Sequence, residues 1–297
     1  MEGQPETPKK LVVGLPKGSL QATTVALLER AGYRLSFVER NYFPEIDDDE
    51  LSLMMFRAQE MSRYVQDGTL DAGITGSDWI AENGSEVVEA ADLHCAEPNY
   101  RRVRWVLAVP EDSGVREVED LEGRIVATEL ANLTARWFAE RGVKVKVEFS
   151  YGATEVKPGR VADAMVDATE TGSTLRANRL REMATLLEST PRLIASAAAW
   201  DDAWKRRKIQ NLVLMLRGAI EARQKVGLKM NVPRKALPEV LELLPSEKSP
   251  TVSDLADADW VAIEVVLEER VERELVPRLK RAGASGIITY PLNKVIP

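Results

Sequence analysis

The stretch Leu11-Val-Val-Gly-Leu15, followed by Pro16-Lys-Gly-Ser19, decides the fold class. A short apolar run bounded by Pro and Gly is typical of a buried strand, and Ser19 can cap a helix after the turn. Apolar side chains then recur at helical spacing from Leu20 to Ala31, and Gly32 ends the pattern. The segment therefore predicts a strand, a tight turn and a covering helix.

The same order of strand and helix repeats through the first two-thirds of the chain. This alternation predicts an α/β protein with parallel sheets covered by helices. A long amphipathic helix is expected after these units. In residue numbers, strands are expected at 51–56, 72–75, 103–109, 124–128 and 144–149, and helices at 61–68, 133–141 and 200–223.

Two segments of the chain resemble one another. Leu70-Asp-Ala-Gly-Ile-Thr-Gly-Ser77 and Ala162-Asp-Ala-Met-Val-Asp167 both contain a helix end, an Asp-Ala pair, a short strand and a polar turn. Two similar α/β lobes that face one another would explain the likeness. Chance similarity is the alternative explanation.

The last quarter of the chain has a different pattern. Its order of strand, helix, strand, strand, helix and strand is that of a ferredoxin-like unit, and its length suits a small separate domain. Pro233 is well placed to open the first helix, because proline is favoured in a first helical turn. The boundary is expected near residues 224–227. The expected strands are 228–232, 251–255, 260–267 and 286–290, and the expected helices are 233–244 and 271–282.

Length, composition and charge exclude several classes of protein. The chain has 297 residues, of which 44% are hydrophobic, as expected for globular domains with a core. Its net charge of −7 argues against a nucleic-acid partner, which needs a basic face. Neither a signal peptide nor a membrane-spanning apolar run is visible, so we expect a cytoplasmic protein without a membrane partner.

The chain has one histidine, His94, and one cysteine, Cys95. One residue of each type excludes a disulfide framework, a cysteine-cluster metal site and a histidine-rich zinc site. Adjacency in sequence does not provide the geometry of a nucleophile and its base. The remaining side chains suit carboxylate and phosphate chemistry, or simple binding.

The segment from Asp163 to Arg176 carries the sharpest functional signal. An apolar strand with Asp167 near its end leads into Thr171-Gly-Ser-Thr174 and then into a helix. Unpaired N–H groups at a helix N-terminus bind anions, and Gly172 allows a phosphate to approach the backbone. Asp167 can accept hydrogen bonds from sugar hydroxyls or help to hold a metal ion. The alternative is an ordinary Ser/Thr cap on a buried helix.

Four further residues are candidate site residues, and three of them have a structural alternative. Glu155 follows a predicted strand and is otherwise a solvated loop acid. Asp78 begins a predicted helix, where a carboxylate is expected on structural grounds. Lys17 lies in the turn after the first strand and can contact a phosphate. Arg57 follows a strand and points either into a cleft or into water.

Several of these segments together resemble ATP phosphoribosyltransferase, the first enzyme of histidine biosynthesis. The resemblance covers nearly the whole chain in order, and its last part matches the long form of the family, which has its own regulatory domain. The segments in the first two-thirds are Leu15-Pro-Lys-Gly18, Gly73-Ile-Thr-Gly-Ser-Asp78, Gly152-Ala-Thr-Glu-Val156, Ala162-Asp-Ala-Met-Val-Asp167 and Thr171-Gly-Ser-Thr-Leu175. The later segments are Ser249-Pro-Thr251, Ala258-Asp-Trp-Val-Ala262, Gly283-Ala284 and Pro291-Leu-Asn-Lys294.

The resemblance implies a fold and a reaction. It implies two catalytic lobes of the type II periplasmic-binding-protein fold and a C-terminal ferredoxin-like, ACT-like regulatory domain. The first lobe would comprise 1–103 and 188–223, the second 104–187, and the regulatory domain 224–297. The implied reaction is transfer of the phosphoribosyl group of phosphoribosyl pyrophosphate (PRPP) to N1 of ATP with release of pyrophosphate. Magnesium would be held largely by the substrate phosphates, so no protein metal site is assigned.

The resemblance also implies site residues and partners. A homo-oligomer, either a dimer or a hexamer, is expected, and histidine is the expected feedback inhibitor. Asp167 and Glu155 are the implied catalytic residues beside the ribose. The implied PRPP contacts are Thr171, Gly172, Ser173, Thr174 and, from the opposite lobe, Lys17. The implied ATP contacts are Asp78 and Arg57, and the implied histidine pocket includes Asn231, Thr251 and Ala284.

The sequence departs from the pattern of this family at two places. The segment Thr128-Glu-Leu-Ala-Asn132 lacks the Tyr-Pro pair found in many members, so no adenine contact is assigned there. Glu170 adds a carboxylate just before the phosphate loop.

One rival function is that of a non-catalytic sensor of small ligands with the same two-lobed fold, and the other is that of a different amino-acid-regulated biosynthetic enzyme. The loop from Asp167 to Thr174 favours a phosphoribosyl substrate.

Overall fold

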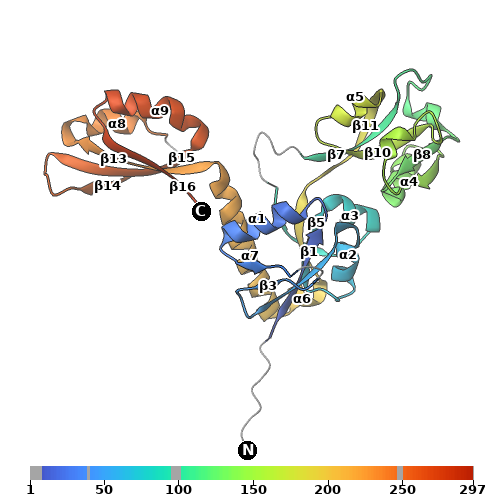
Figure 1. The fold of residues 1–297 in the computed structure, drawn as a ribbon, viewed down its shortest axis with the longest axis horizontal. Coiled ribbons are helices and arrows are strands. Elements are labelled where there is room, and N and C mark those ends of the chain that lie inside the picture. The colour runs from blue at the N-terminus through green and yellow to red at the C-terminus, as the bar shows by residue number, and fades with distance from the viewer. Residues whose placement is uncertain (1–8, 39–40, 95–101, 246–249, 297) are drawn as a thin grey trace, which may run out of the picture. The chain divides into compact units, whose positions relative to one another are not determined.

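The computed structural model describes residues 9–38, 41–94, 102–245 and 250–296 (Figure 1). Within them the chain divides into two compact units, one formed by residues up to 29 together with 33–213, and the other by 30–32 and the residues from 214 onward. Cys95 of the His-Cys pair and Ser249 of the C-terminal motif lie outside the described residues. The expected α/β class is confirmed.

The first unit contains a sheet with strand order β4-β1-β5-β12-β6. β1 pairs in parallel with β4 and β5, whereas β12 runs antiparallel to β5 and β6. Its strands are β1 Leu11–Lys17, β4 Leu51–Arg57, β5 Ala72–Gly76, β6 Val88–Asp92 and β12 Pro191–Ala195. Helices α1 Gln21–Ala31, α2 Ala58–Gln66 and α3 Ser77–Asn83 connect these strands, and two short strands, β2 Leu35–Ser36 and β3 Glu45–Ile46, pair with one another.

Met61 places α2 close to this sheet. Its side chain is fully buried and packs with Val65 and Ile194. A Cβ atom added at Gly14 or at Gly73 would lie only 2.3 or 2.7 Å from Met61 Sδ. Glycine at these two strand positions therefore leaves the space that the methionine side chain fills.

The second sheet of the first unit has strand order β11-β7-β10-β8-β9. Side chains of β7 alternate between two cores, with Trp105 facing the cluster of α4 and Val106 facing the cluster of α5, so helices cover both faces. Its strands are β7 Val103–Pro110, β8 Ile125–Thr128, β9 Lys146–Phe149, β10 Ala164–Thr169 and β11 Leu180–Ser189. The helical elements are η1 Val118–Leu121, α4 Ala131–Ala139, η2 Thr154–Val156 and α5 Ser173–Ala177.

The expectation of purely parallel sheets is wrong, because each sheet contains antiparallel pairs. The chain passes from β6 of the first sheet to β7 of the second, and it returns from β11 to β12 across the single residue Thr190. The first strand after each crossing, β7 or β12, is antiparallel to its neighbour β10 or β5. The strands joined by helical crossovers within one sheet are parallel. β11 was not predicted, because its segment carries many polar side chains and has no clear apolar run.

The two sheets repeat one another. Read from β9, the second sheet has the order β9-β8-β10-β7-β11, which matches β4-β1-β5-β12-β6 of the first in the number, position and direction of the strands. The two similar sequence segments form β5 and β10, which occupy the same place in the two sheets. The expected two-lobed architecture is therefore confirmed, and internal repetition rather than chance explains the likeness.

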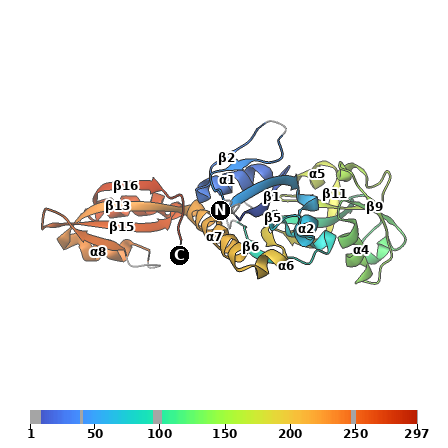
Figure 2. The same cartoon turned by 90° about the horizontal axis from the view of Figure 1, so that it is seen from below.

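The second unit has the expected ferredoxin-like order and the sheet β14-β15-β13-β16. Adjacent strands are antiparallel, and Figure 2 shows β16, β13 and β15 side by side. Buried residues of the strands pack against Val240, Leu275 and Leu279 of the helices. The elements are β13 Lys225–Pro233, η4 Arg234–Ala236, α8 Leu237–Leu243, β14 Thr251–Asp254, β15 Trp260–Glu268, α9 Glu269–Arg281 and β16 Ser285–Pro291.

Two predicted helix boundaries are wrong. Pro233 ends β13, and Pro238 instead occupies the first turn of α8. The predicted helix over 200–223 is divided at Asp202 into α6 Ala197–Asp201 and α7 Ala203–Glu221, followed by η3 Ala222–Gln224. Asp202 has extended backbone, and its Oδ1 accepts hydrogen bonds from the backbone N–H groups of Trp204 and Lys205 at 2.8 and 2.9 Å. The aspartate therefore starts a new helix as its cap.

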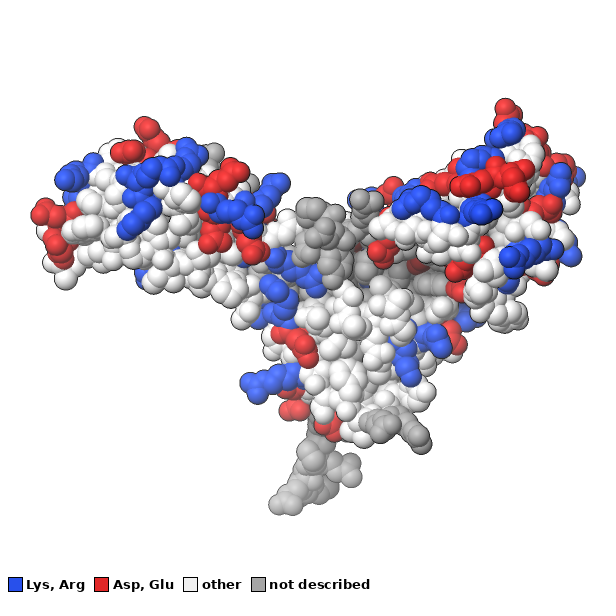
Figure 3. All heavy atoms as spheres, turned by 45° about the horizontal axis from the view of Figure 1, so that its top comes forward, with Lys and Arg blue, Asp and Glu red and all other residues white. Residues whose placement is uncertain are grey.

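The surface charge and the hydropathy of the helices can also be described. On the face drawn in Figure 3, acidic and basic side chains are interspersed. No helix of the described residues is long and apolar enough to span a membrane.

Candidate functional site

The predicted strand-loop-helix segment is confirmed at the end of β10. The helix α5 begins at Ser173, and Gly172 precedes it with a left-handed backbone (φ 69°). The loop is ordered by its own hydroxyl groups: Gly172 N donates to Thr169 Oγ1 at 2.9 Å, and Thr171 Oγ1 donates to Ser173 Oγ at 3.0 Å. The side chains of Ser173 and Thr174 are exposed. Hydroxyl and N–H donors therefore lie at one short turn.

A cation that the sequence analysis did not consider lies beside this loop. Arg176 Nη1 donates to the carbonyl oxygen of Thr171 at 3.1 Å. A Cβ atom added at Gly172 would approach the same guanidinium to 3.2 Å. Glu170 is exposed, and Arg176 places a positive charge close to the turn. The signal for Arg176 was its position one helical turn after Gly172.

Asp167 lies near the C-terminal end of β10 in an environment that disfavours its charge. Burial raises its pKa to about 6, and the nearby negative charges of Glu155 and Glu129 act in the same direction. A hydrogen bond from the Ala168 backbone N–H at 2.7 Å and one from the Thr154 hydroxyl lower the pKa. The structure thus brings Asp167 and Glu155 together, as expected from the sequence, and adds Glu129 as a third carboxylate.

A buried chain of hydroxyl groups supports this acidic cluster. Lys157 Nζ donates to Ser150 Oγ at 2.7 Å, and Ser150 Oγ lies 2.8 Å from Thr154 Oγ1. Both hydroxyl residues are buried, and Ala153 before them has a left-handed backbone (φ 48°) that is uncommon for a residue other than glycine. Glu155 of this segment was predicted from the sequence, whereas the supporting hydroxyls and the lysine have no local signal.

Lys17 and Arg57 lie together in the first lobe. They are the last residues of β1 and β4 and are paired in register. A pocket of about 730 Å³ opens beside them, and Lys17 Nζ lies 4.1 Å from the centroid of the Tyr42 ring. The pocket is lined by Lys17, Gly18, Tyr42, Phe43, Met54, Met55, Phe56, Arg57, Glu60 and Tyr64. The carboxyl ends of parallel strands are where ligands bind in open α/β sheets, so this pocket is a second candidate region.

Asp78 occupies a different environment from Lys17 and Arg57. It is buried at the start of α3, where Trp105 Nε1 donates to its Oδ2 at 2.8 Å. Its Oδ1 accepts from the Trp79 backbone N–H at 2.9 Å, and its own backbone N–H donates to Ser189 Oγ at 3.2 Å. Burial raises the pKa of Asp78. These contacts match the structural alternative for Asp78, and its role toward ATP stays a prediction.

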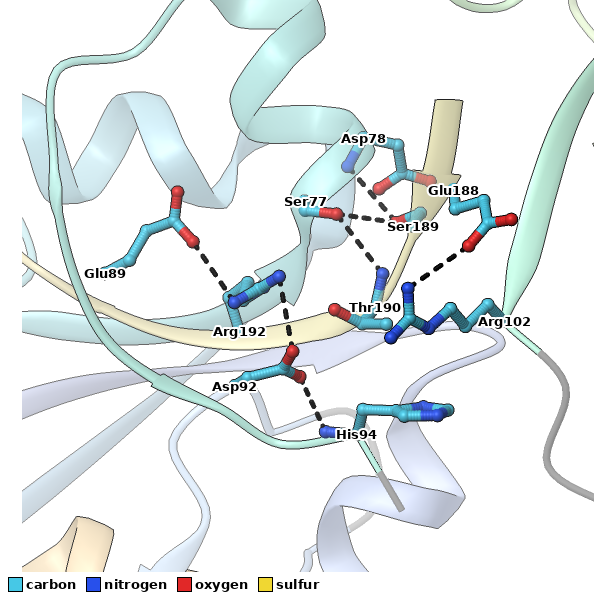
Figure 4. A network of polar contacts seen from close by, with 10 residues as sticks. All are labelled: Ser77, Asp78, Glu89, Asp92, His94, Arg102, Glu188, Ser189, Thr190 and Arg192. Carbon is cyan, nitrogen blue, oxygen red and sulfur yellow. Dashed lines mark hydrogen bonds and ion pairs between the residues drawn. The ribbon is translucent and has the colours of Figure 1, made fainter. Parts of the chain in front are cut away.

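The residues around Asp78 belong to the segments that join the two lobes (Figure 4). Ser77 Oγ accepts a hydrogen bond from the backbone N–H of Thr190, the residue between β11 and β12. Nearby, Arg192 forms ion pairs with Glu89 and Asp92. The backbone N–H of His94 donates to Asp92 Oδ1 at 2.8 Å.

The three residues expected near the histidine pocket lie on different parts of the second unit. Asn231 is exposed on β13 and is in register with Ser285 of β16, which directly follows Ala284. Ala284 is buried in the core of this unit. Thr251 begins β14, on the other side of β15. The structure therefore brings Asn231 and Ala284 together and leaves Thr251 two strands away from β13.

Among the described residues, no group of three or more His, Cys, Asp or Glu side chains is arranged to hold a metal ion. Glu129 and Glu155 act on Asp167 through their charge, but the three do not form such a group. The donors at the turn of Gly172 are N–H and O–H groups, which suit a phosphate rather than a cation.

Comparison with known proteins connects these features to a family. The family model described as ATP phosphoribosyltransferase matches residues 57–218, and the one described as HisG, C-terminal domain, matches residues 222–294. An ATP phosphoribosyltransferase of Chlorobaculum parvum is 56% identical over 286 residues, which cover 96% of this chain and 97% of that protein. One of Thermodesulfovibrio yellowstonii is 54% identical over 289 residues, which cover 97% and 99%.

A solved structure supports the same fold. The ATP phosphoribosyl transferase (HisG:HisZ) complex from Thermotoga maritima contains a chain that matches with a TM-score of 0.61 at 24% identity, covering 71% of this chain and 98% of that one. The sequence matches extend over both units. Together they show that the chain belongs to the ATP phosphoribosyltransferase family, in its long form with a C-terminal domain.

Proposed function

We propose that this chain transfers the phosphoribosyl group of PRPP to N1 of ATP and releases pyrophosphate, the first step of histidine biosynthesis. Family membership over almost the whole chain supports the reaction. The observation that carries the assignment of the site is the arrangement of Asp167 directly before the turn of Gly172, with Glu155 beside it. The division into lobes 1–103 with 188–223 and 104–187, and a regulatory domain 224–297, is part of this proposal.

PRPP is proposed to bind with its 5-phosphate at the turn from Thr171 to Thr174. Backbone N–H groups at this turn, the hydroxyls of Ser173 and Thr174, and the positive charge of Arg176 are all suitable donors. The ribose then lies next to Asp167, because this residue precedes the turn on the same strand. Lys17 is proposed to contact the pyrophosphate from the other lobe.

The chemistry needs alignment and charge stabilisation more than acid-base catalysis. Displacement of pyrophosphate leaves positive character on the ribose anomeric carbon, and nearby carboxylates stabilise such a charge. Ionised Asp167 and Glu155 are proposed to fulfil this role. No histidine or cysteine is required, in keeping with a chain that has one of each.

ATP is proposed to bind from the side of Arg57. The pocket beside this arginine contains exposed aromatic rings, Tyr42 and Phe43, and its cations suit the triphosphate. The predicted role of Asp78 toward ATP would require its carboxylate to exchange the Trp105 contact for a ligand. Magnesium is proposed to arrive on the substrate phosphates, because the donors of the described site suit anions.

Regulation and assembly form a separate part of the proposal. The ferredoxin-like unit is not needed to build a two-lobed catalytic part, and we propose that it binds histidine near Asn231, Ala284 and Thr251. Inhibition would then be a coupling between two distant sites, typically worth about 1–3 kcal/mol. A homo-oligomer, dimer or hexamer, in the cytoplasm is proposed. Insensitivity of the full chain to millimolar histidine would argue against the regulatory role.

The direct test is an assay with ATP, PRPP and magnesium. Phosphoribosyl-ATP and pyrophosphate should form in equal amounts, followed by the absorbance change of the modified adenine and by mass spectrometry. Omission of either substrate, or chelation of magnesium, should abolish the product. Binding of both substrates without product would instead support the sensor function and contradict the enzymatic one.

A further inference from the structure

The helix α4 has no capping side chain of its own. Its N-cap residue is Leu130, which makes no side-chain capping bond, and its first turn contains no acidic residue. Leu130 is fully buried, so its side chain serves the core. The first N–H groups of a helix need acceptors, and Ser, Thr, Asp or Asn normally provides them at this position. The acceptor for α4 must therefore come from elsewhere.

Glu82 on α3 supplies this cap from the other lobe. Its Oε1 accepts from the Asn132 backbone N–H at 3.0 Å, and its Oε2 accepts from the Leu133 backbone N–H at 2.8 Å. Asn132 and Leu133 are the second and third residues of α4, where a capping side chain binds. Glu82 is buried, with 7% of its surface exposed, and its negative charge also faces the positive end of the helix dipole.

The contact is reciprocal. At the end of α3, the carbonyl oxygen of Glu82 accepts from Asn132 Nδ2 at 3.4 Å, and the carbonyl oxygen of Ala81 accepts from the Arg136 guanidinium. Two helices that belong to different sheets thus cap one another. Trp79 of α3 adds an edge-to-face contact with Trp105 of β7, with ring centroids 6.2 Å apart.

The capped end of α4 is joined directly to the acidic cluster. Residues 128–130 connect β8 to α4, and within them Leu130 N donates to Thr128 Oγ1 at 3.0 Å. Glu129 lies in the middle of this turn and acts electrostatically on Asp167. Thr128, the last residue of β8, is in register with Val166 of β10, the residue before Asp167. Any displacement of the first turn of α4 therefore moves this turn relative to Asp167.

We propose that Glu82 is a positioning residue for phosphoribosyl transfer: by capping α4 from the first lobe, it holds the turn of Glu129 in place beside Asp167 in the second lobe. The inference rests on the proposed function for its effect on turnover. Its structural part, the cap, does not depend on that function. Neither the sequence motifs nor the pocket beside Lys17 includes Glu82.

The test compares Glu82→Gln with a matched control, Glu122→Gln. A glutamine keeps the length of the side chain but replaces one of the two accepting oxygens by an NH2 group, which cannot accept from a backbone N–H, and it loses the charge. Glu122 accepts from the backbone N–H of Lys144 at 2.5 Å in the second lobe, which also contains α4, near the opposite ends of the strands. Each variant is measured for kcat, for KM with both substrates, for melting temperature, and for hydrogen exchange of the backbone amides of residues 128–133. Glu82→Asp, which restores the carboxylate, is the rescue variant.

For Glu82→Gln we expect kcat to fall by about tenfold or more at a temperature well below melting. A shift of the turn at residues 128–130 moves Asp167 through the pairing of Thr128 with Val166, and small displacements of site residues are costly to turnover. KM values should change little, exchange of the amides of Asn132 and Leu133 should accelerate, and Glu82→Asp should recover part of the lost kcat. Glu122→Gln should keep wild-type kcat. Wild-type kcat in Glu82→Gln with only a lower melting temperature overturns the positioning role, and so does unchanged amide exchange. A wild-type chain that forms no product contradicts the proposed function alone, since the exchange measurement needs no turnover.

Discussion

Asp71 and Asp163 make the same pair of hydrogen bonds in the two lobes. Asp71 Oδ2 accepts from the backbone N–H of Val12 at 2.9 Å, and Asp71 N donates back to the Val12 carbonyl oxygen at 2.9 Å. Asp163 Oδ2 accepts from Ile125 N at 3.0 Å, and Asp163 N donates to the Ile125 carbonyl oxygen at 2.9 Å. Each aspartate thereby fixes the start of one central strand to the next. The Asp-Ala pair that recurs in the sequence therefore marks the same hydrogen-bonded contact between strands in both lobes.

Replacing these aspartates by alanine should destabilise the two lobes to different extents. Either change leaves a strand N–H without its acceptor, which typically costs about 1–3 kcal/mol. Asp71 is buried and pairs with Lys205 at 2.6 Å, whereas Asp163 is more exposed and pairs with Arg124 at 3.0 Å. Thermal unfolding should therefore show a larger loss for Asp71→Ala than for Asp163→Ala. Wild-type melting temperatures for both variants would contradict the structural role of the two aspartates.

Activity should rise with pH through the titration of Asp167. Its pKa is raised to about 6, and the proposed role requires the ionised form. The profile of kcat/KM for PRPP should therefore have an acidic limb near this pH, because this parameter reports groups of the free enzyme. The limb should be missing from the residual activity of Asp167→Asn. Its persistence in that variant would assign the limb to another group.

Glu129→Gln should move that acidic limb to lower pH. The negative charge of Glu129 raises the pKa of Asp167, so its removal makes Asp167 easier to ionise. Glu129→Gln should also reduce the loss of folding stability that the raised pKa of Asp167 causes as the pH rises. A group whose pKa is raised by folding binds more protons in the folded state, so stability falls as pH rises between the unfolded and the folded pKa. A shift of the limb to higher pH would contradict the proximity of the two carboxylates.

Gly172→Ala should weaken PRPP binding in addition to lowering the stability of the fold. Both Gly172 and Gly123 have left-handed backbones, with φ of 69° and 72°. Alanine at either position should therefore cost a similar amount, about 1–2 kcal/mol for the left-handed conformation. Gly172→Ala should in addition raise KM for PRPP, because the methyl group lies at the proposed phosphate turn near Arg176. Equal KM values in Gly172→Ala and the control Gly123→Ala would contradict the assignment of the turn.

The sequence predicted the features that depend on local pattern. Short apolar runs identified β1, β4 and β5, and the segment from Asp167 to Ser173 identified the turn before α5. It also predicted that Asp167 and Glu155 lie near one another, and Glu155 acts on Asp167 through its charge. These predictions succeeded because strand, turn and helix signals lie within a few residues of one another.

The features that the sequence missed depend on contacts between distant segments. Glu82 caps α4 across 50 residues, and no local pattern connects the two. The hydrogen bond from the Trp105 indole to the Asp78 carboxylate also joins distant segments and has no local signal. Pro233 was expected to open a helix, but the pairing of β13 with β15 extends to that residue. These features depend on tertiary contacts, which no local pattern reports.

The most direct test of the central claim is the rate of phosphoribosyl-ATP formation by the wild-type chain and by Asp167→Asn. The substitution removes the carboxylate charge beside the proposed ribose while keeping the size of the side chain. The wild type should form product from ATP, PRPP and magnesium, and turnover by the variant should be lower by about 100-fold or more, as for loss of one preorganised electrostatic group. PRPP should still stabilise the variant thermally. Near-wild-type turnover by Asp167→Asn, or no product from the wild type when both substrates bind, would contradict the account.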